Sequence, residues 1–393
     1  MDIAIVGAGL GGLTAAAALL QRGHRVRVYE QAGALGEVGA GIQMSANAVK
    51  VLDSLGLRAA LEASAVRPKA FEFRRFDSGD VLHRLPLGDA HEQRHGAPYF
   101  QMHRSDLHGA LQAAVMALDP QAITLNARVM AIDEDHAGAS VHFDTLPTVQ
   151  ADLVIGADGI KSVVRRHIVG EDARPVFTGQ VAWRCTVPTE RIAPALRTDI
   201  VSTIWCGPKN HAVMYYLRGG ALLNFVGCVE SATPDEESWT ARRPWAELDA
   251  EYRGWHPMVR AVIDQVDRDQ CFRWALNARQ PDTQWSSGRA TLLGDAVHAT
   301  LPYMAQGAVM AIEDAAVLAR ALELPGPLAE RLRRYAAHRA PRTARVVRES
   351  SEMGELYHIG EAQAMRRAFA ERDIARSRNA WLYPYDPLRV EIG

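Results

Sequence analysis

The sequence has few cysteines and almost no excess of charge. The four cysteines lack paired spacing and lie scattered among apolar residues, so neither a zinc site nor a disulfide framework is expected. A formal net charge of -2 and the lack of any basic run argue against a nucleic-acid partner. We therefore expect a cytoplasmic globular protein without a bound metal, in which the cysteines remain reduced: Cys185, Cys206, Cys228 and Cys271.

One long uncharged run, residues 3–20, has the hydropathy of a membrane span or a signal peptide. Asp2 stands where a signal peptide would carry positive charge, and no small-residue cleavage site is followed by a polar segment. Glycines interrupt the run where a turn would be needed. We therefore expect this segment to be buried in a domain, with no integral membrane association.

The same region has the pattern of a strand, a glycine-rich turn, a helix and a second strand, which predicts a parallel sheet. A chain of 393 residues is long enough for two cores. Alternating strands between about 175 and 275 predict an antiparallel sheet inserted into the first domain. The elements expected are strands at 2–6, 25–29, 122–132, 140–143 and 151–155, and helices at 13–22, 46–55, 106–117, 307–322 and 327–349.

The glycine-rich turn carries the spacing GxGxxG at Gly7, Gly9 and Gly12, and Glu30 ends the second strand. These glycines allow a tight turn, close approach of the backbone to a pyrophosphate and close helix packing, and the acid suits ribose hydroxyls. A diphosphate would also lie at the positive end of the helix dipole. The motif predicts a bound dinucleotide and leaves FAD and NAD as alternatives.

Two later segments follow strands in the same way: Gly156-Ala157-Asp158-Gly159, and Gly294-Asp295-Ala296 with Gln306-Gly307 opening a helix. With these motifs in order over essentially the whole chain, the sequence resembles the class A flavoprotein monooxygenases of the aromatic hydroxylase type. That family includes the 4-hydroxybenzoate and salicylate hydroxylases. The resemblance implies an α/β fold, with a Rossmann-like FAD-binding domain of the 4-hydroxybenzoate hydroxylase type and an inserted, mostly antiparallel substrate-binding sheet.

On this resemblance the chain divides into interleaved parts. We expect residues 1–70, 97–174 and 276–350 to form the FAD-binding domain, and residues 71–96 and 175–275 to form the substrate-binding sheet domain. Residues 351–393 would be a helical and irregular tail. No second GxGxxG is present, which fits NADH or NADPH visiting as a transient reductant while FAD stays bound non-covalently.

The resemblance also implies cofactor contacts. Asp295 would bind the flavin ribityl chain, Asp158 would lie near the pyrophosphate, and Arg104 would bind the phosphates, with a surface salt bridge as its alternative role. Helix amides beginning at Gly307 would stabilise the negative charge of reduced flavin. The further FAD contacts expected are Leu10, Gln31, Gln43, Val129, Gln306 and Ala308.

A phenolate is hydroxylated far more readily than a phenol, so a base or dipole is expected near the substrate hydroxyl. His211 and Tyr215 face the same side of one strand, and the family places that strand over the flavin. We predict His211 as base or hydroxyl partner and Tyr215 as hydrogen-bond donor, the alternative being a structural role for both. Arg184, Lys209 and Arg218 are candidate cations for a substrate carboxylate, the alternative for each being a solvated surface charge.

The remaining pocket residues expected are Tyr303, Pro302 beside the flavin ring, and Gln43. The segment GAGIQ at 39–43 resembles a stretch that borders the flavin, but some pyridine-ring hydroxylases of the family carry a histidine at the position of Gln43. We therefore assign Gln43 no catalytic role. His298, next to Asp295, is expected to be structural.

The expected reaction is reduction of FAD by NAD(P)H, formation of a C4a-hydroperoxyflavin with O2, and hydroxyl transfer to a small hydroxylated aromatic or pyridine carboxylic acid. The closest similarity is to salicylate, 3-hydroxybenzoate and 6-hydroxynicotinate hydroxylases. The sequence does not distinguish among these acids, or between NADH and NADPH. It also does not distinguish plain from decarboxylative hydroxylation, or a monomer from a homodimer. The alternatives are an FAD-dependent reductase or oxidase without oxygen insertion, and a flavin-bound sensor without enzymatic activity.

Overall fold

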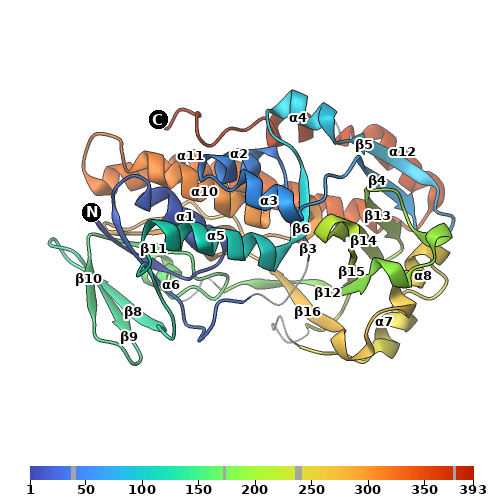
Figure 1. The fold of residues 1–393 in the computed structure, drawn as a ribbon, viewed down its shortest axis with the longest axis horizontal. Helices are drawn as coiled ribbons and strands as arrows, with labels where there is room; N and C mark the ends of the chain where they lie inside the picture. Colours follow the sequence, from blue (N-terminus) through green and yellow to red (C-terminus); the bar gives the residue numbers. More distant parts are fainter. Residues whose placement is uncertain (37–40, 171–173, 235–240, 375–377) are drawn as a thin grey trace.

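The computed structural model describes residues 1–36, 41–170, 174–234, 241–374 and 378–393. Within these ranges the strands form two large sheets and two small ones. The large parallel sheet and the three-stranded sheet lie at one end of the molecule, and the seven-stranded sheet lies at the other (Figure 1). The expected α/β fold with an added antiparallel sheet is confirmed.

The first large sheet is entirely parallel and has the order β17-β11-β1-β2-β7. Its central strand β1 pairs with β11 and β2 in register, so that Ile3 lies opposite both Leu153 and Val26. Helix α1 packs between α5 and α10 beside this sheet. The strands are β1 (Asp2–Val6), β2 (Arg25–Tyr29), β7 (Ile123–Thr124), β11 (Leu153–Gly156) and β17 (Ala290–Leu292).

The uncharged run near the start of the chain forms β1 and α1, and all its apolar side chains except that of Leu20 are buried. Among the described residues, no helix combines the length and the apolar character that crossing a bilayer would require. Helices α1 (Leu10–Leu20) and α6 (Val163–Val169) contact the sheet, and α5 (Arg104–Leu118) and α10 (Gly307–Ala321) pack on α1.

The seven-stranded sheet has the order β16-β12-β15-β14-β13-β4-β5. All neighbouring strands are antiparallel except β4 and β13, which are parallel. Its strands are β4 (Ala70–Arg75), β5 (Val81–Pro86), β12 (Val176–Pro188), β13 (Ser202–Gly207), β14 (Asn210–Leu217), β15 (Leu222–Glu230) and β16 (Phe272–Ala278).

The two small sheets are β8-β9-β10 and the pair β3-β6, and β6 contacts β14 of the seven-stranded sheet. Their strands are β3 (Gly41–Met44), β6 (Phe100–His103), β8 (Val129–Glu134), β9 (Ala139–Phe143) and β10 (Val149–Ala151). The other α-helices are α2 (Ala46–Ser54), α3 (Arg58–Ser64), α4 (Asp89–His95), α7 (Trp245–Glu251), α8 (Pro257–Asp264), α9 (Asp295–His298), α11 (Leu328–Tyr357) and α12 (Ala362–Glu371).

Several boundaries differ from the sequence-based expectations. Helix α1 starts three residues early because Gly9 is its extended N-cap, so Gly12 lies inside the helix. The strand expected at 122–132 is two strands, separated where Asn126 adopts a positive φ of 54°. The middle block also contains α7 and α8. Helix α11 continues past 349 because Met353, Leu356 and Tyr357 keep a buried face at helical spacing.

Helices α10 and α11 are joined by a buried ionic network. Glu313 and Asp314 of α10 and Arg339 of α11 are all 0% exposed. Arg339 lies 2.7 Å from an oxygen of each carboxylate, and Arg342 lies 2.7 Å from Glu313. Burial favours protonation of Asp314, but His298 and Arg339 outweigh it and lower its pKa to about 2. Both carboxylates of α10 therefore stay ionised and paired at neutral pH.

The same carboxylates hold two turns in place. Asp314 accepts a hydrogen bond from the backbone N–H of Gly294 at 3.0 Å and also bonds to His298, which gives that histidine the structural role expected of it. Glu313 accepts from the amide of Asn47 at 2.6 Å. The network thus positions the turn before α9 and the start of α2 relative to α10.

We predict that Arg339→Met lowers the free energy of unfolding by about 3–5 kcal/mol, because it leaves two ionised carboxylates buried with too few partners. Arg348→Met is the matched control: Arg348 is exposed on the same helix, so its loss should change stability by less than about 0.5 kcal/mol. Urea unfolding of both variants at one fixed FAD concentration measures the difference. Equal stabilities would show that the network does not hold the helices together.

Candidate functional site

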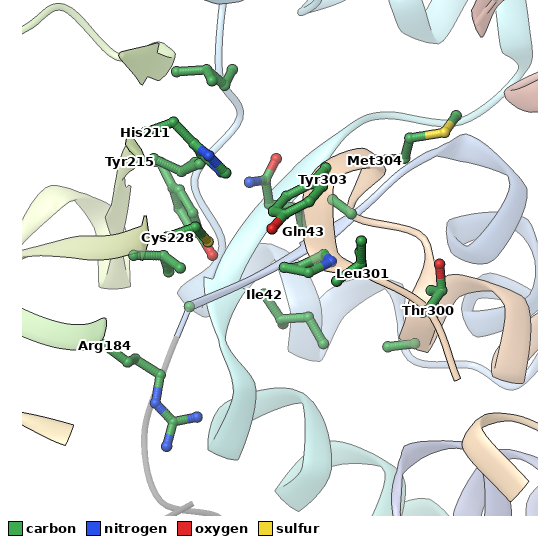
Figure 2. Close-up of a pocket in the computed structure, with 18 of the residues that line it drawn as sticks. Ile42, Gln43, Arg184, His211, Tyr215, Cys228, Thr300, Leu301, Tyr303 and Met304 are labelled. Atoms are coloured by element: carbon green, nitrogen blue, oxygen red, sulfur yellow. The ribbon is translucent and has the colours of Figure 1, made fainter. Parts of the chain in front are cut away.

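A cavity of about 250 Å³ lies where the β3-β6 pair, the seven-stranded sheet and the start of α10 meet. Figure 2 shows His211, Tyr215 and Cys228 on one side of it and Tyr303, Gln43 and Leu301 opposite. The sequence-predicted residues that line the cavity are Gln43, Arg104, Arg184, His211, Tyr215, Asp295, Pro302, Tyr303, Gly307 and Ala308.

The glycine-rich turn after β1 is shaped by close backbone contacts. Gly7 has a φ of +101°, and a Cβ there would lie 2.5 Å from the carbonyl oxygen of Ala157. A Cβ at Gly12 would lie 2.1 Å from the carbonyl oxygen of Gly7. A Cβ at Gly9, by contrast, would meet no described atom within 4 Å. The turn therefore leaves open space above Gly9, at the N-terminus of α1.

The acids predicted beside this turn have local partners. Glu30 accepts hydrogen bonds from the backbone N–H of Ala8 at 2.8 Å and of Ala32 at 2.9 Å. Asp158 accepts from Ser162 Oγ at 2.6 Å and from the N–H of Val163 at 2.7 Å at the start of α6. The Asp158 carboxylate thus caps α6, while its Cα lies 3.0 Å from the Cβ position of Gly7.

The other predicted cofactor contacts do not all reach the cavity. Leu10 and Val129 are buried in the core of the first domain, and Gln31 is exposed just beyond β2. Gln306 is 1% exposed and points inward: its amide donates to Ser45 Oγ at 3.1 Å and accepts from Asn47 at 3.2 Å. Its side chain therefore fixes the start of α10, and α10 faces the cavity through Gly307 and Ala308.

Tyr215 and Gln43 form a polar wall between β14 and β3. The ring of Tyr215 packs directly on Gly41, where a Cβ would lie 2.5 Å from Tyr215 Cε2. Gln43 accepts a hydrogen bond from Tyr99 at 2.9 Å and also bonds to Tyr215. Burial raises the pKa of Tyr215, so this phenol remains a donor at neutral pH. Residues 39 and 40 of the segment GAGIQ lie outside the described residues.

His211 has one ring nitrogen in a relay and the other unbonded. Its Nδ1 lies 2.8 Å from Nε2 of His358, whose Nδ1 lies 3.0 Å from the carboxylate of Glu230. Nε2 of His211 is buried and has no hydrogen-bond partner within the described part of the chain. Burial lowers the pKa of His211, and the neighbouring His358 lowers it further, so the imidazole is neutral at pH 7.

The relay also sets the tautomers. An ionised Glu230 only accepts, so Nδ1 of neutral His358 carries the proton and its Nε2 accepts from Nδ1–H of His211. Nε2 of His211 is then left with a lone pair, on a residue that lines the cavity. The glutamate side chain is 45% exposed. The arrangement can therefore take a proton from a ligand hydroxyl and pass it towards water.

Of the other residues predicted for the pocket, some line the cavity and others do not. Tyr303 has its ring centroid 4.8 Å from that of His211, but its hydroxyl is bound to Gln180. Of the three candidate cations, only Arg184 lines the cavity, where it lies over Trp274 at 5.0 Å. Lys209 is exposed in the turn between β13 and β14, and Arg218 is exposed and paired with Asp106 at 2.9 Å. Those two positions were therefore wrong candidates.

Several cavity residues were missed in the sequence. They come from segments that carry no recognisable motif: Phe71, Cys228, Trp274, Tyr357 and Arg378. Arg378 lies beyond α12 in the tail. The only sequence signal in this part of the chain is its aromatic residues, among them those at 357, 381, 383 and 385, which are of a type that usually packs onto a core.

Comparison with known proteins identifies the family. Residues 1–350 match the family described as FAD binding domain. The chain is 38% identical to 3-amino-4-hydroxybenzoate 2-monooxygenase of Streptomyces platensis, with 99% of this chain and 97% of the relative covered. It is 37% identical to 3-hydroxybenzoate 6-hydroxylase of Polaromonas naphthalenivorans, covering 98% and 96%. It is 38% identical to 6-hydroxynicotinate 3-monooxygenase of Bordetella bronchiseptica, covering 89% and 90%.

Solved structures of related proteins have the same fold. HpxO of Klebsiella pneumoniae, complexed with FAD and uric acid, has 28% identity and a TM-score of 0.84, covering 96% of this chain and 95% of that one. A salicylate hydroxylase substrate complex has 25% identity and a TM-score of 0.81, covering 98% and 95%. The resemblance inferred from the motifs is thereby confirmed: the chain belongs to the FAD binding domain family, among relatives that are aromatic-ring monooxygenases.

Proposed function

We propose that this protein is an FAD-dependent monooxygenase that uses NAD(P)H and O2 to hydroxylate a small, already hydroxylated aromatic or pyridine carboxylic acid. The observation that carries the proposal is the neutral, buried His211, whose unbonded Nε2 belongs to the cavity lining and whose other nitrogen connects to the surface. The printed names of the relatives describe oxygenation of hydroxylated benzoates and a hydroxynicotinate, which supports the substrate class.

The residues present fit FAD. The open space above Gly9 would receive the pyrophosphate, with Glu30 beside it for the ribose. Arg104 and the exposed Asp295, both in the cavity lining, are proposed for the phosphates and the ribityl chain. FAD, when bound, supplies the electron transfer and oxygen activation that amino-acid side chains lack.

The protein's own residues would prepare the substrate. His211 Nε2 would accept the proton of the substrate hydroxyl and Tyr215 would donate a hydrogen bond to the same end, so that the ring gains the electron density of a phenolate. Leu301, Ile204 and Trp274 supply apolar wall, which would keep water from the reacting atoms. The first amides of α10, beginning at Gly307, would stabilise negative charge on the reduced cofactor.

The division into domains is proposed on the sheet memberships. Strands β4 and β5 share one sheet with β12 to β16, which favours assigning 71–96 and 175–275 to the substrate domain. The strands of the parallel sheet favour assigning residues 1–70, 97–174 and 276–350 to the FAD-binding domain, with residues 351–393 as the tail. A homodimer and a cytoplasmic location stay predictions.

The first test is a substrate screen. The purified FAD-loaded protein is given NADH or NADPH with 3-amino-4-hydroxybenzoate, 3-hydroxybenzoate, salicylate or 6-hydroxynicotinate. We expect one of these acids to accelerate NAD(P)H oxidation and to yield a product that has gained one oxygen by mass spectrometry. Accelerated oxidation without an oxygenated product would favour the alternative, a reductase or oxidase, and no acceleration would favour a flavin-bound sensor.

The second test removes the base. We expect His211→Asn to lower the rate of hydroxylation on the order of 100-fold or more, because the hydroxyl keeps its proton. The rate should recover as the pH rises towards the ordinary phenol pKa of about 10, where the substrate ionises by itself. Stopped-flow measurement of product formation at pH 6–10 tests this. Tyr216→Phe on the same strand, whose hydroxyl donates to Thr198, is the control and should keep the native pH profile.

The third test separates cofactor binding from folding. Gly9→Ala should weaken FAD binding by about tenfold or more, since its methyl group would occupy the open space above the turn, while apoprotein stability changes by less than about 1 kcal/mol. Gly12→Ala should destabilise the apoprotein itself, because its Cβ would clash with the carbonyl oxygen of Gly7. FAD titration and apoprotein unfolding distinguish the two. A Gly9→Ala protein with native FAD affinity would contradict the proposed pyrophosphate position.

A further inference from the structure

A buried guanidinium from the tail forms part of the cavity. Arg378 begins the short helical turn η6 (Arg378–Leu382), is 4% exposed and lines the same cavity as His211. It lies outside residues 1–350, the part matched by the FAD binding domain family. The cavity wall therefore includes a cation that the family match does not cover.

The partners of Arg378 are aromatic. It hydrogen-bonds with Tyr383 and Tyr357, and its guanidinium carbon lies 5.4 Å from the ring centroid of Phe71. Across the ranges that the structure describes, it forms no ion pair with a carboxylate. The nearby acids of α11 have other partners: Glu349 pairs with Arg345 and Glu352 with Arg372.

The contrast with other buried arginines is informative. Arg339, which is 0% exposed, has two carboxylate partners, and Arg165, at 4%, has Asp282 at 2.9 Å. An arginine does not lose its proton in a protein, so a buried one without a counter-ion is costly. Tyrosine hydroxyls compensate only part of that cost. An anionic group that enters the cavity would supply the missing counter-ion of Arg378.

The charge of the other lining residues also favours an anionic ligand. Among the described residues that line it there are three arginines, Arg104, Arg184 and Arg378, and a single carboxylate, Asp295. The planar guanidinium matches a carboxylate in a bidentate pair, which orients a ligand as well as binding it. Tyr357 connects Arg378 with His211, since it bonds to Arg378 and has its ring centroid 5.1 Å from that of His211.

We propose that Arg378 binds the carboxylate of the substrate and thereby orients the ring with its hydroxyl group towards His211. This inference rests on the proposed function for the ring and its hydroxyl, but anion binding at Arg378 does not depend on turnover. It gives the tail a specificity-determining residue: acids are accepted, and neutral analogues of the same shape are rejected.

The experiment measures binding to the oxidised, FAD-loaded protein by the change in flavin absorbance, without NADH. The ligands are 3-hydroxybenzoate and 3-hydroxybenzamide, which differ only in the charged group. We expect the native protein to bind the acid 10- to 100-fold more tightly than the amide, the range of a charge-assisted hydrogen bond. Arg378→Met should abolish that preference by weakening the acid alone, and Arg378→Lys should restore part of it.

Arg184→Met is the comparison, and it should alter both affinities by a similar factor. If the native protein binds the acid and the amide with equal affinity, the proposal is overturned. This outcome needs no variant, so the proposal stays testable even if Arg378→Met does not fold. Loss of the preference in Arg184→Met with its retention in Arg378→Met also overturns it. If Arg378 controls acid binding but no acid yields an oxygenated product, the proposed function fails and the anion site stands.

Discussion

The structure depends on two ionised carboxylates held away from water between α10 and α11. Glu313 and Asp314 are adjacent on α10 and share Arg339, while Glu313 also pairs with Arg342 and Asp314 also bonds to His298, so the helix is held at several points. Through Asn47 the network reaches the side chain of Gln306, and through the N–H of Gly294 it reaches the turn that presents Asp295. One buried cluster therefore sets the two segments that face the cavity from the FAD-binding side.

The cavity itself combines groups whose charge is determined by burial. The imidazole of His211 is neutral and the phenol of Tyr215 is protonated, so neither brings a net charge to the polar end of the cavity. Positive charge comes instead from the arginines of its lining, Arg104, Arg184 and Arg378. Proton exchange at His211 and attraction of an anion by the arginines can therefore proceed independently, because the two functions use different residues.

Local signals made much of the fold predictable. The βαβ unit and the helices that pack on it follow from residues adjacent in the sequence, and the period-two alternation correctly placed His211 and Tyr215 in one cavity. The inward turn of Gln306 was not predictable, since its partners at 45 and 47 are distant in the chain. His358 and Arg378 were missed for a related reason: a charged or polar residue is usually exposed, and only tertiary packing shows otherwise.

The participation of the tail in the cavity wall has a consequence for biosynthesis. Residues after 350 leave the ribosome only when the whole parallel sheet and the seven-stranded sheet have already been made. Until Tyr357 and Arg378 dock, their part of the cavity wall is missing. A nascent chain can thus complete its glycine-rich turn well before the tail closes the wall of the cavity.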